Sequence, residues 1–428
     1  MLCTVLCVSS LASCRRNESS NDPNTLKVAV LESAYGSEMW EKICDEFEKL
    51  NGGMTVELTA EKNLEDVIGA QMKGGDYPDV VHLATGREAA LTETLIKDEA
   101  LTDLTEVFEM TIPGEDTKVS DKLIPGFTDT LATNPYKDKK TYLAPMFYSP
   151  CGLFYDADLL EDNGWKVPES WDEMWELGDE AKKKGIYLFT YPTAGYFDAF
   201  IYALLAESGG IDFYNDVMNY KEAVWDTPEA TRVLNIIKRL ADYTEPTTVA
   251  NSTGDNYLKN QQLVLDGKAI FMPNGTWVVG EMEDAPRREG FRWGFTALPA
   301  IEEDRYSFTF FEQCWIPKEA KNKTAAKEFI AFLYSDKAAE IFASYGAVQP
   351  ISDITDSLDG DNKLFYSVYE DGAKAVMGGF AATEAVAGVS IYDTLFESIN
   401  SIMTGDKTVD TWKNEIIAAS DKLRDNLK

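Results

Sequence analysis

The spacing of apolar residues predicts alternating strands and helices from residue 26 onward. Leu26 to Leu31 is a continuous apolar run, which is typical of a buried strand. Ser37 is expected to cap the helix that follows, because apolar side chains then recur on one face, at positions 40, 43, 44, 47 and 50. Residues 54–59 alternate as a second strand, 63–73 form a helix, and 80–83 form a third strand. This order predicts a parallel sheet, whose ligands bind beyond the carboxyl ends of the strands.

Residues 143–185 predict a second unit of strand and helix. The apolar run 143–148 indicates a strand, which the turn-forming residues 149–152 are expected to break. A helix is expected to begin at Ser170, because Ser170 and Glu173 have the spacing of a capping box. In that motif each side chain accepts a hydrogen bond from the other residue's backbone N–H.

The rest of the chain continues the same alternation. Helices are expected to begin near residues 197, 228, 324 and 408, with Gly209-Gly210 closing the first of them. Strands are expected at 293–298 and 308–316, separated by a candidate hinge at 299–304. Five tryptophans on predicted helix or strand faces are expected in the core: Trp40, Trp171, Trp175, Trp293 and Trp412.

Length and charge limit the kind of protein this can be. A chain of 428 residues exceeds what one hydrophobic core usually organises, so two lobes are expected. The net charge of −33 repels nucleic-acid backbones and anionic membrane surfaces, so we expect no nucleic-acid partner. The same charge disfavours an anionic ligand unless a local basic pocket overrides it, although solubility alone also accounts for the acidity.

The first 25 residues differ from the rest of the chain. Residues 1–14 are apolar and small, too short to span a membrane, and end in Leu-Ala-Ser-Cys. This ending resembles the lipobox of bacterial lipoproteins, which implies a signal peptide and a lipid on Cys14. No Lys or Arg precedes the apolar run, but residues 15–25 form a polar tether that cannot bury apolar surface. A buried N-terminal strand is the alternative interpretation.

Residue types that carry catalysis or hold metals are sparse. Three cysteines outside the N-terminal segment lie among apolar residues, at positions 44, 151 and 314, and are expected to be buried free thiols. The single histidine, His82, lies in a predicted strand and is expected to be a core residue with satisfied hydrogen bonds. The sequence has no nucleophile elbow, phosphate loop, dinucleotide fingerprint or zinc spacing. We therefore expect no cofactor, no metal and no enzyme activity.

Four stretches together resemble one protein family. Tyr77 to Val81 contains Pro-Asp-Val, and residues 142–173 combine Tyr-Leu-Ala-Pro, Tyr-Asp-Ala-Asp-Leu-Leu, a Gly, a Pro and Ser-Trp-Asp-Glu. Residues 269–277 read AIFMPNGTW, and residues 321–350 run from Lys-Asn to a final Gly-Ala-Val-Gln-Pro. These patterns resemble the extracellular solute-binding proteins of bacterial ABC importers, in the carbohydrate-binding class related to maltose-binding protein. Asp156 and Ser170 stand where that family usually has Asn and Thr, and both keep the local hydrogen bonding.

The resemblance implies a two-lobed α/β fold, with a mixed sheet flanked by helices in each lobe and a ligand cleft between them. One lobe would comprise residues 26–147 plus 308–347, and the other 148–304 plus 350–428. The implied function is to bind a sugar or oligosaccharide and deliver it to the permease of an ABC transporter by hinge closure. The protein would be a monomer outside the cytoplasmic membrane, held there only by its lipid.

Candidate ligand residues follow from the chemistry of sugars and from the family pattern. Aromatic faces stack on the C–H faces of a pyranose, and planar polar groups pair with its hydroxyls. Suitable residues lie beside turn-forming residues, at strand ends or at positions matching the family cleft: Tyr35, Gly36, Thr85, Gly86, Arg87, Tyr148, Ser149, Tyr196, Asp198, Asn274, Gly275, Trp277, Glu312 and Tyr392. An arginine at position 87 also suits a surface salt bridge, and Glu312 suits either a cleft or an exposed sheet edge.

Three other functions stay open on the sequence alone. A binding protein of this kind could take a peptide, a polyol or an organic anion, although aromatic candidates outnumber basic ones. A surface glycoside hydrolase needs only two carboxylates about 5 to 10 Å apart, and the sequence has 73 acidic residues. A surface adhesin or sensor could share the fold.

Overall fold

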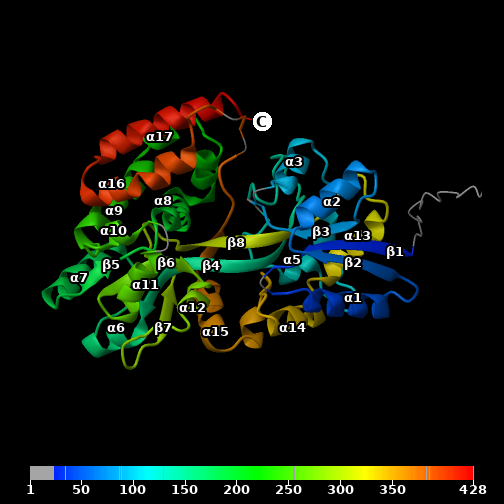
Figure 1. The fold of residues 1–428 in the computed structure, drawn as a ribbon, viewed down its shortest axis with the longest axis horizontal. Helices are drawn as coiled ribbons and strands as arrows, with labels where there is room; N and C mark the ends of the chain where they lie inside the picture. Colours follow the sequence, from blue (N-terminus) through cyan, green and yellow to red (C-terminus); the bar gives the residue numbers. More distant parts are fainter. Residues whose placement is uncertain are drawn as a thin grey trace, which may run out of the picture.

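The computed structural model describes residues 24–427 except positions 34, 86, 88, 129, 254, 255, 382 and 385. Two bodies of helices and strands lie side by side, and two long strands run between them, β4 (Ala144–Asp156) and β8 (Tyr306–Trp315) (Figure 1). The body that contains the first three strands is termed the first lobe. The body that contains the long helix α8 (Phe197–Met218) is termed the second lobe.

The sheet of the first lobe begins as the sequence predicts. Strands β1 (Thr25–Leu31), β2 (Thr55–Glu61) and β3 (Val80–Leu83) are parallel, with β1 in the middle. Helices α1 (Glu38–Leu50) and α2 (Leu64–Lys73) connect them, which confirms the predicted alternation. The apolar face of α1 packs on α13 (Lys323–Phe332), where Phe47 meets Phe329 edge to face at 5.0 Å between ring centroids.

One sheet continues through both lobes, rather than one sheet in each. Its strand order is β2-β1-β3-β8-β4-β6-β5, with β6 at Ala269–Gly275 and β5 at Tyr187–Phe189. Strand β7 (Trp293–Thr296) pairs with β4, and β9 (Lys374–Val376) pairs with β8. Parallel and antiparallel pairs both occur, so the predicted α/β fold with mixed strand directions is confirmed.

The predicted break at residues 149–152 is wrong, because β4 runs through them without interruption. Its first half pairs with β8 as far as Pro150, and from Cys151 onward it pairs with β6. The proline therefore ends one ladder, where its missing N–H is tolerated. A Cβ at Gly152 would collide with the carbonyl oxygen of Thr296 on β7, so this glycine permits close strand packing. The predicted crossing between lobes, near Phe147 to Pro150, lies in the middle of β4.

Helices cover the sheet in both lobes. Helices α14 (Asp336–Ser344) and α15 (Gly360–Tyr366) lie along one edge of the molecule beneath the crossing strands, and α16 (Ile399–Thr404) and α17 (Val409–Arg424) pack in the second lobe (Figure 1). The remaining helical segments are α3 (Leu91–Lys97), α4 (Thr105–Glu109), α5 (Val119–Lys122), α6 (Ala157–Asn163), α7 (Trp171–Lys183), η1 (Ala194–Tyr196), η2 (Val224–Asp226), α9 (Pro228–Leu240), η3 (Ala241–Tyr243), α10 (Thr248–Asn251), α11 (Tyr257–Leu265), α12 (Val278–Glu281), η5 (Ile354–Ser357), η6 (Ser367–Tyr369) and η7 (Asp393–Glu397).

Local signals at helix ends were partly correct: the Thr227 and Thr408 side chains cap α9 and α17, whereas the Ser37 side chain makes no capping hydrogen bond to α1. The predicted end at Gly209-Gly210 is a kink inside α8, where Gly210 has a φ of 74° that side chains disfavour. The Ser170 hydroxyl accepts from the Glu173 N–H at 3.3 Å, as the capping box requires. The return bond differs from the prediction, because the Glu173 carboxylate accepts from the N–H of Glu169, one residue earlier.

Core predictions are confirmed for the tryptophans and the cysteines. The five tryptophans expected in the core are all buried, and Cys44, Cys151 and Cys314 are buried free thiols. His82 is buried as predicted, but neither ring nitrogen has a hydrogen-bond partner among the described residues. The prediction that its hydrogen bonds are satisfied is therefore wrong. Within the described ranges no helix is long and apolar enough to cross a membrane. The segment predicted to be a signal peptide, most of the predicted tether and Cys14 lie outside the described residues.

Candidate functional site

A cavity of about 410 Å³ opens where the second lobe meets the crossing strands. Strand β4 contributes Cys151, β8 contributes Phe310, and the turn from η1 into α8 contributes a cluster of small and polar residues. The complete lining is Cys151, Thr193, Gly195, Tyr196, Asp198, Ala199, Asn274, Trp277 and Phe310. Four of these were predicted from the sequence as ligand residues: Tyr196, Asp198, Asn274 and Trp277.

Three aromatic rings form a shelf along this pocket. Trp277 lies between Tyr196, at 6.3 Å between ring centroids, and Phe310, at 5.7 Å, and both pairs are tilted by about 60°. Trp277 is 36% exposed and Phe310 is 42% exposed, which is unusual for such large apolar side chains. A Cβ at Gly275 would collide with the Trp277 ring, so the glycine at the end of β6 lets that ring fold back over the backbone.

Two planar polar groups lie beside the shelf. Asp198, in the first turn of α8, uses one carboxylate oxygen to accept from the backbone N–H of Ala199. Burial raises the pKa of Asp198 to about 6, and no described residue forms a salt bridge with it. Asn274 is only 3% exposed; its amide oxygen accepts from the Gly275 N–H at 2.9 Å, while its Nδ2 has no partner among the described residues.

A second group of predicted residues gathers in the first lobe, at the carboxyl ends of β1 and β3. The Tyr35 ring meets Phe147 edge to face at 5.7 Å, and burial together with the charge of Glu312 raises its pKa to about 12. Gly36 follows with a φ of 76°. Arg87 donates from Nε to the Glu65 carboxylate at 2.8 Å, so the ion pair expected as an alternative for this arginine is present.

Glu312 on β8 connects the two groups. Phe310 and Glu312 are two residues apart, so their side chains project from the same side of the strand. The carboxylate lies 3.2 Å from Nε2 of His82 without forming a hydrogen bond. Burial raises the pKa of Glu312 to about 7, an effect that Arg87 partly offsets, and lowers the pKa of His82 to about 3. His82 is therefore neutral at physiological pH, and the carboxylate has no cation in contact within the described chain.

The other predicted ligand residues lie near the pocket or apart from it. The Ser149 hydroxyl bonds that of Thr276 at 2.6 Å, beside the pocket, and Thr85 exchanges hydrogen bonds with the Gln313 side chain. Tyr148 is buried against Phe127, Tyr366 and Tyr369, away from the pocket lining. Tyr392 is 48% exposed at the start of η7, which packs against η1. Gly86 lies outside the described residues.

Phe310 is the main residue that the sequence interpretation missed. It stands in the run Phe308 to Phe311, which reads as part of a buried strand. The usable signal was strand alternation, because Glu312 was already a candidate and Phe310 shares its side of the strand. Thr193, Cys151 and Ala199 carried no comparable signal, since small side chains are common in any core.

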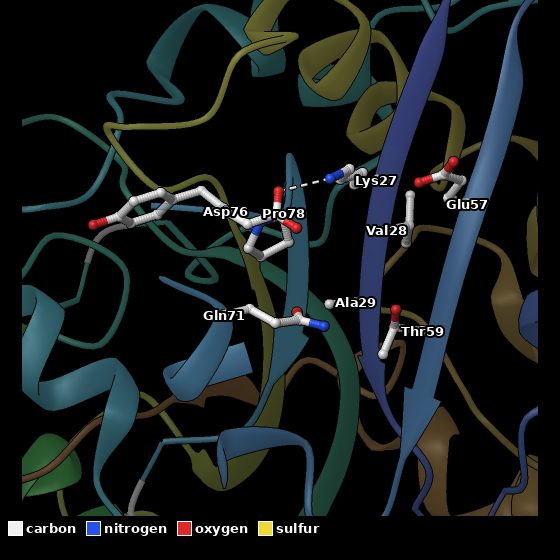
Figure 2. Close-up of a pocket in the computed structure, with 9 residues that line it drawn as sticks. Lys27, Val28, Ala29, Glu57, Thr59, Gln71, Asp76 and Pro78 are labelled. Carbon is white, nitrogen blue, oxygen red and sulfur yellow. Dashed lines mark hydrogen bonds and ion pairs between the residues drawn. The ribbon is translucent and has the colours of Figure 1, made fainter. Parts of the chain in front are cut away.

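A second, smaller cavity of about 130 Å³ lies on the first lobe between β1, β2 and the loop before β3. Figure 2 shows Lys27 of β1 reaching toward Asp76, and the two form an ion pair at 2.7 Å. Gln71 of α2 and Thr59 of β2 also line it. Its charged groups include this internal pair and it has no aromatic shelf, so the larger pocket is the better candidate site.

Comparison with known proteins identifies the family and the fold. The family model described as "Bacterial extracellular solute-binding protein" matches residues 42–363. The diacetylchitobiose binding protein NgcE of Streptomyces coelicolor is 25% identical over 434 residues, covering 96% of this chain and 88% of that protein. Two solved structures share the fold. RafE of Streptococcus pneumoniae has a TM-score of 0.70 and 18% identity, with 94% of this chain and 98% of that chain covered. The sugar-binding protein MalE of Xanthomonas citri has a TM-score of 0.70 and 17% identity, with 94% of this chain and 97% of that chain covered.

Proposed function

The chain belongs to the bacterial extracellular solute-binding proteins, and from that premise we propose that it binds a carbohydrate beside Trp277 and delivers it to an ABC permease. Relatives whose names state a ligand support the class of ligand, since NgcE is named for diacetylchitobiose and MalE for sugar. Those names differ in the sugar, so they support carbohydrate as a class and leave the individual sugar open.

The observation that carries the proposal is an exposed aromatic shelf next to two planar polar groups, each of which keeps one atom free to bond a ligand. Trp277 and Phe310 offer ring faces to the C–H faces of a pyranose, while Asp198 and Asn274 offer an acceptor and a donor to its polar groups. A volume of about 410 Å³ falls within the range of about 300 to 1,000 Å³ that is usual for small-molecule sites. A basic lining, which an organic anion would need, is not found among the described lining residues.

Delivery requires that the bound and free forms differ. We propose that Tyr35, Arg87 and Glu312 of the first lobe form the opposite wall and meet the sugar when the lobes close about β4 and β8. A ligand that contacts both lobes shifts the population toward the closed form, which the permease recognises. The division of the chain into lobes at residues 147/148, 304/308 and 347/350 is part of this proposal.

The family is one of binding proteins, and we propose that this chain performs no chemistry on its ligand. Asp198 and Glu312 are the carboxylates that a glycosidase would have to use here. Incubation with oligosaccharides should yield no new reducing ends; their appearance would favour the hydrolase alternative. We also propose that the protein is a monomer outside the cytoplasmic membrane, anchored through a lipid on Cys14.

A thermal-shift screen against mono- and oligosaccharides tests the proposal, with peptides, polyols and organic anions as comparison. A ligand at 100 times its Kd should add about 2.7 kcal/mol of stability. Trp277→Ala should weaken binding of the best sugar at least about 10-fold, because it removes the centre of the shelf. The matched control is Trp165→Ala, a partly exposed tryptophan that lies under Lys184 and outside the pocket. Stabilisation by peptides or anions but by no sugar would contradict the proposal.

A further inference from the structure

The pocket contains a donor and an acceptor that the protein leaves unused. The buried Nδ2 of Asn274 has no partner among the described residues, although its own oxygen is held by the Gly275 N–H. Asp198 keeps one carboxylate oxygen beyond the bond to Ala199. A buried unpaired donor is costly, and a ligand group that accepts from it recovers that cost. The ligand must therefore accept at Asn274 and donate at Asp198.

The charge of the pocket lining narrows the class of sugar further. Asp198 is the one charged residue among the nine described lining residues, and it has no salt bridge there. An acidic sugar would place its carboxylate against Asp198 and is disfavoured. An amino sugar would pair its ammonium group with Asp198, but that group has no lone pair to accept from Asn274.

Apolar surface lies next to the polar pair. Cys151 and Ala199 line the same pocket with small side chains, and the Phe310 ring stands exposed beside them. A sugar hydroxyl can donate to Asp198 or accept from Asn274, yet it leaves this apolar surface uncovered. An acetamido group instead presents an acceptor, a donor and a methyl group within one planar unit.

We propose that this recess recognises the acetamido group of an N-acetylhexosamine, with Asn274 donating to its carbonyl oxygen and Asp198 accepting from its N–H. The methyl group lies against Cys151 and Ala199. This inference rests on the proposed carbohydrate-binding function and names the class of sugar. Asn274 and Asp198 then act as specificity-determining residues, because a hydroxyl in place of the acetamido group satisfies only part of the site.

Three disaccharides that differ only at the C2 substituents test this directly by calorimetric titration. Diacetylchitobiose carries acetamido groups, chitobiose carries amino groups and cellobiose carries hydroxyls on the same linkage. We expect diacetylchitobiose to bind about 10- to 100-fold more tightly than either of the others, the range for hydrogen bonds to charged or buried groups. Binding of cellobiose or chitobiose within about threefold of diacetylchitobiose would overturn the inference.

Asn274→Asp is the sharpest variant, because it keeps the shape and the acceptor for the Gly275 N–H but replaces the free donor with an acceptor. It should remove the preference for diacetylchitobiose. The matched control is Asn256→Asp, the same change of charge at an exposed position at the start of α11. If Asn274→Asp does not fold, Ala199→Leu decides instead, since it fills the space for the methyl group. Retention of the preference in the folded variant overturns the assignment.

Failure of this inference and failure of the proposed function give different binding results. A protein that binds maltose, lactose or raffinose but not diacetylchitobiose contradicts the acetamido inference alone. A protein that binds no carbohydrate at all contradicts both.

Discussion

Truncation of Phe310 to alanine tests the aromatic shelf at the residue that sequence patterns did not indicate. Phe310 is 42% exposed, and a buried aromatic side chain removes about 150 to 250 Å² from water, so roughly 60 to 100 Å² is available for a sugar to cover. At about 25 cal/mol per Å², covering that area contributes about 1.5 to 2.5 kcal/mol. We therefore expect the Kd of the best sugar to rise about 10- to 70-fold.

The assay is calorimetric titration of wild type and variant, with thermal unfolding as the check on folding. Stability should change by less than about 1 kcal/mol, the span of strand propensity, because much of the ring is already in water. Leu364→Ala on α15 is the control, since Leu364 is similarly exposed, at 38%, but lies outside the pocket lining. A folded Phe310→Ala protein that binds within twofold of wild type would refute the stacking argument.

Three further predictions each concern a single residue. Gly275→Ala should weaken sugar binding as much as loss of Trp277, because the new Cβ displaces that ring, whereas Gly280→Ala, with open space around it, should not. Glu312→Gln should raise the melting temperature at pH 8 but not at pH 4, since burial raises the carboxyl pKa from its ordinary 4.5 to about 7, and the cost of its charge is absent below 4.5, grows between these two values and is complete above 7; equal shifts at both pH values would contradict this. Cys14→Ala should move the protein from the detergent phase to the aqueous phase in detergent partitioning of cells, and an unchanged distribution would exclude the lipid anchor.

Much of the fold could be predicted because the signals are local. The helical spacing of Trp40 and Phe47 and the apolar run of β1 mark the residues that face the core. Periodicity alone therefore predicted this helix and this strand. The same logic placed the five core tryptophans correctly. The break expected at residues 149–152 failed because pairing with β8 and β6, more than 100 residues away in the sequence, overrides the local preference of a proline and a glycine.

The site was only partly predictable, because exposure at a pocket is a tertiary property. Asn274 lies near the end of β6, Trp277 follows that strand, and Asp198 lies in the first turn of α8, so their positions at the ends of elements indicated them. Phe310 and Tyr148 both stand in apolar strand segments that look alike in sequence. Neighbouring elements decide between them, since Tyr366 and Tyr369 cover Tyr148 while the Phe310 ring faces the pocket.

A crystal structure of the protein with the sugar that binds most tightly is the most direct test of the central claim. We expect a pyranose ring over Trp277, with polar contacts to Asp198 and Asn274 and further contacts from the first lobe around Glu312. A sugar bound elsewhere, with the Trp277 and Phe310 rings still exposed to solvent, would contradict the assignment of this pocket as the binding site.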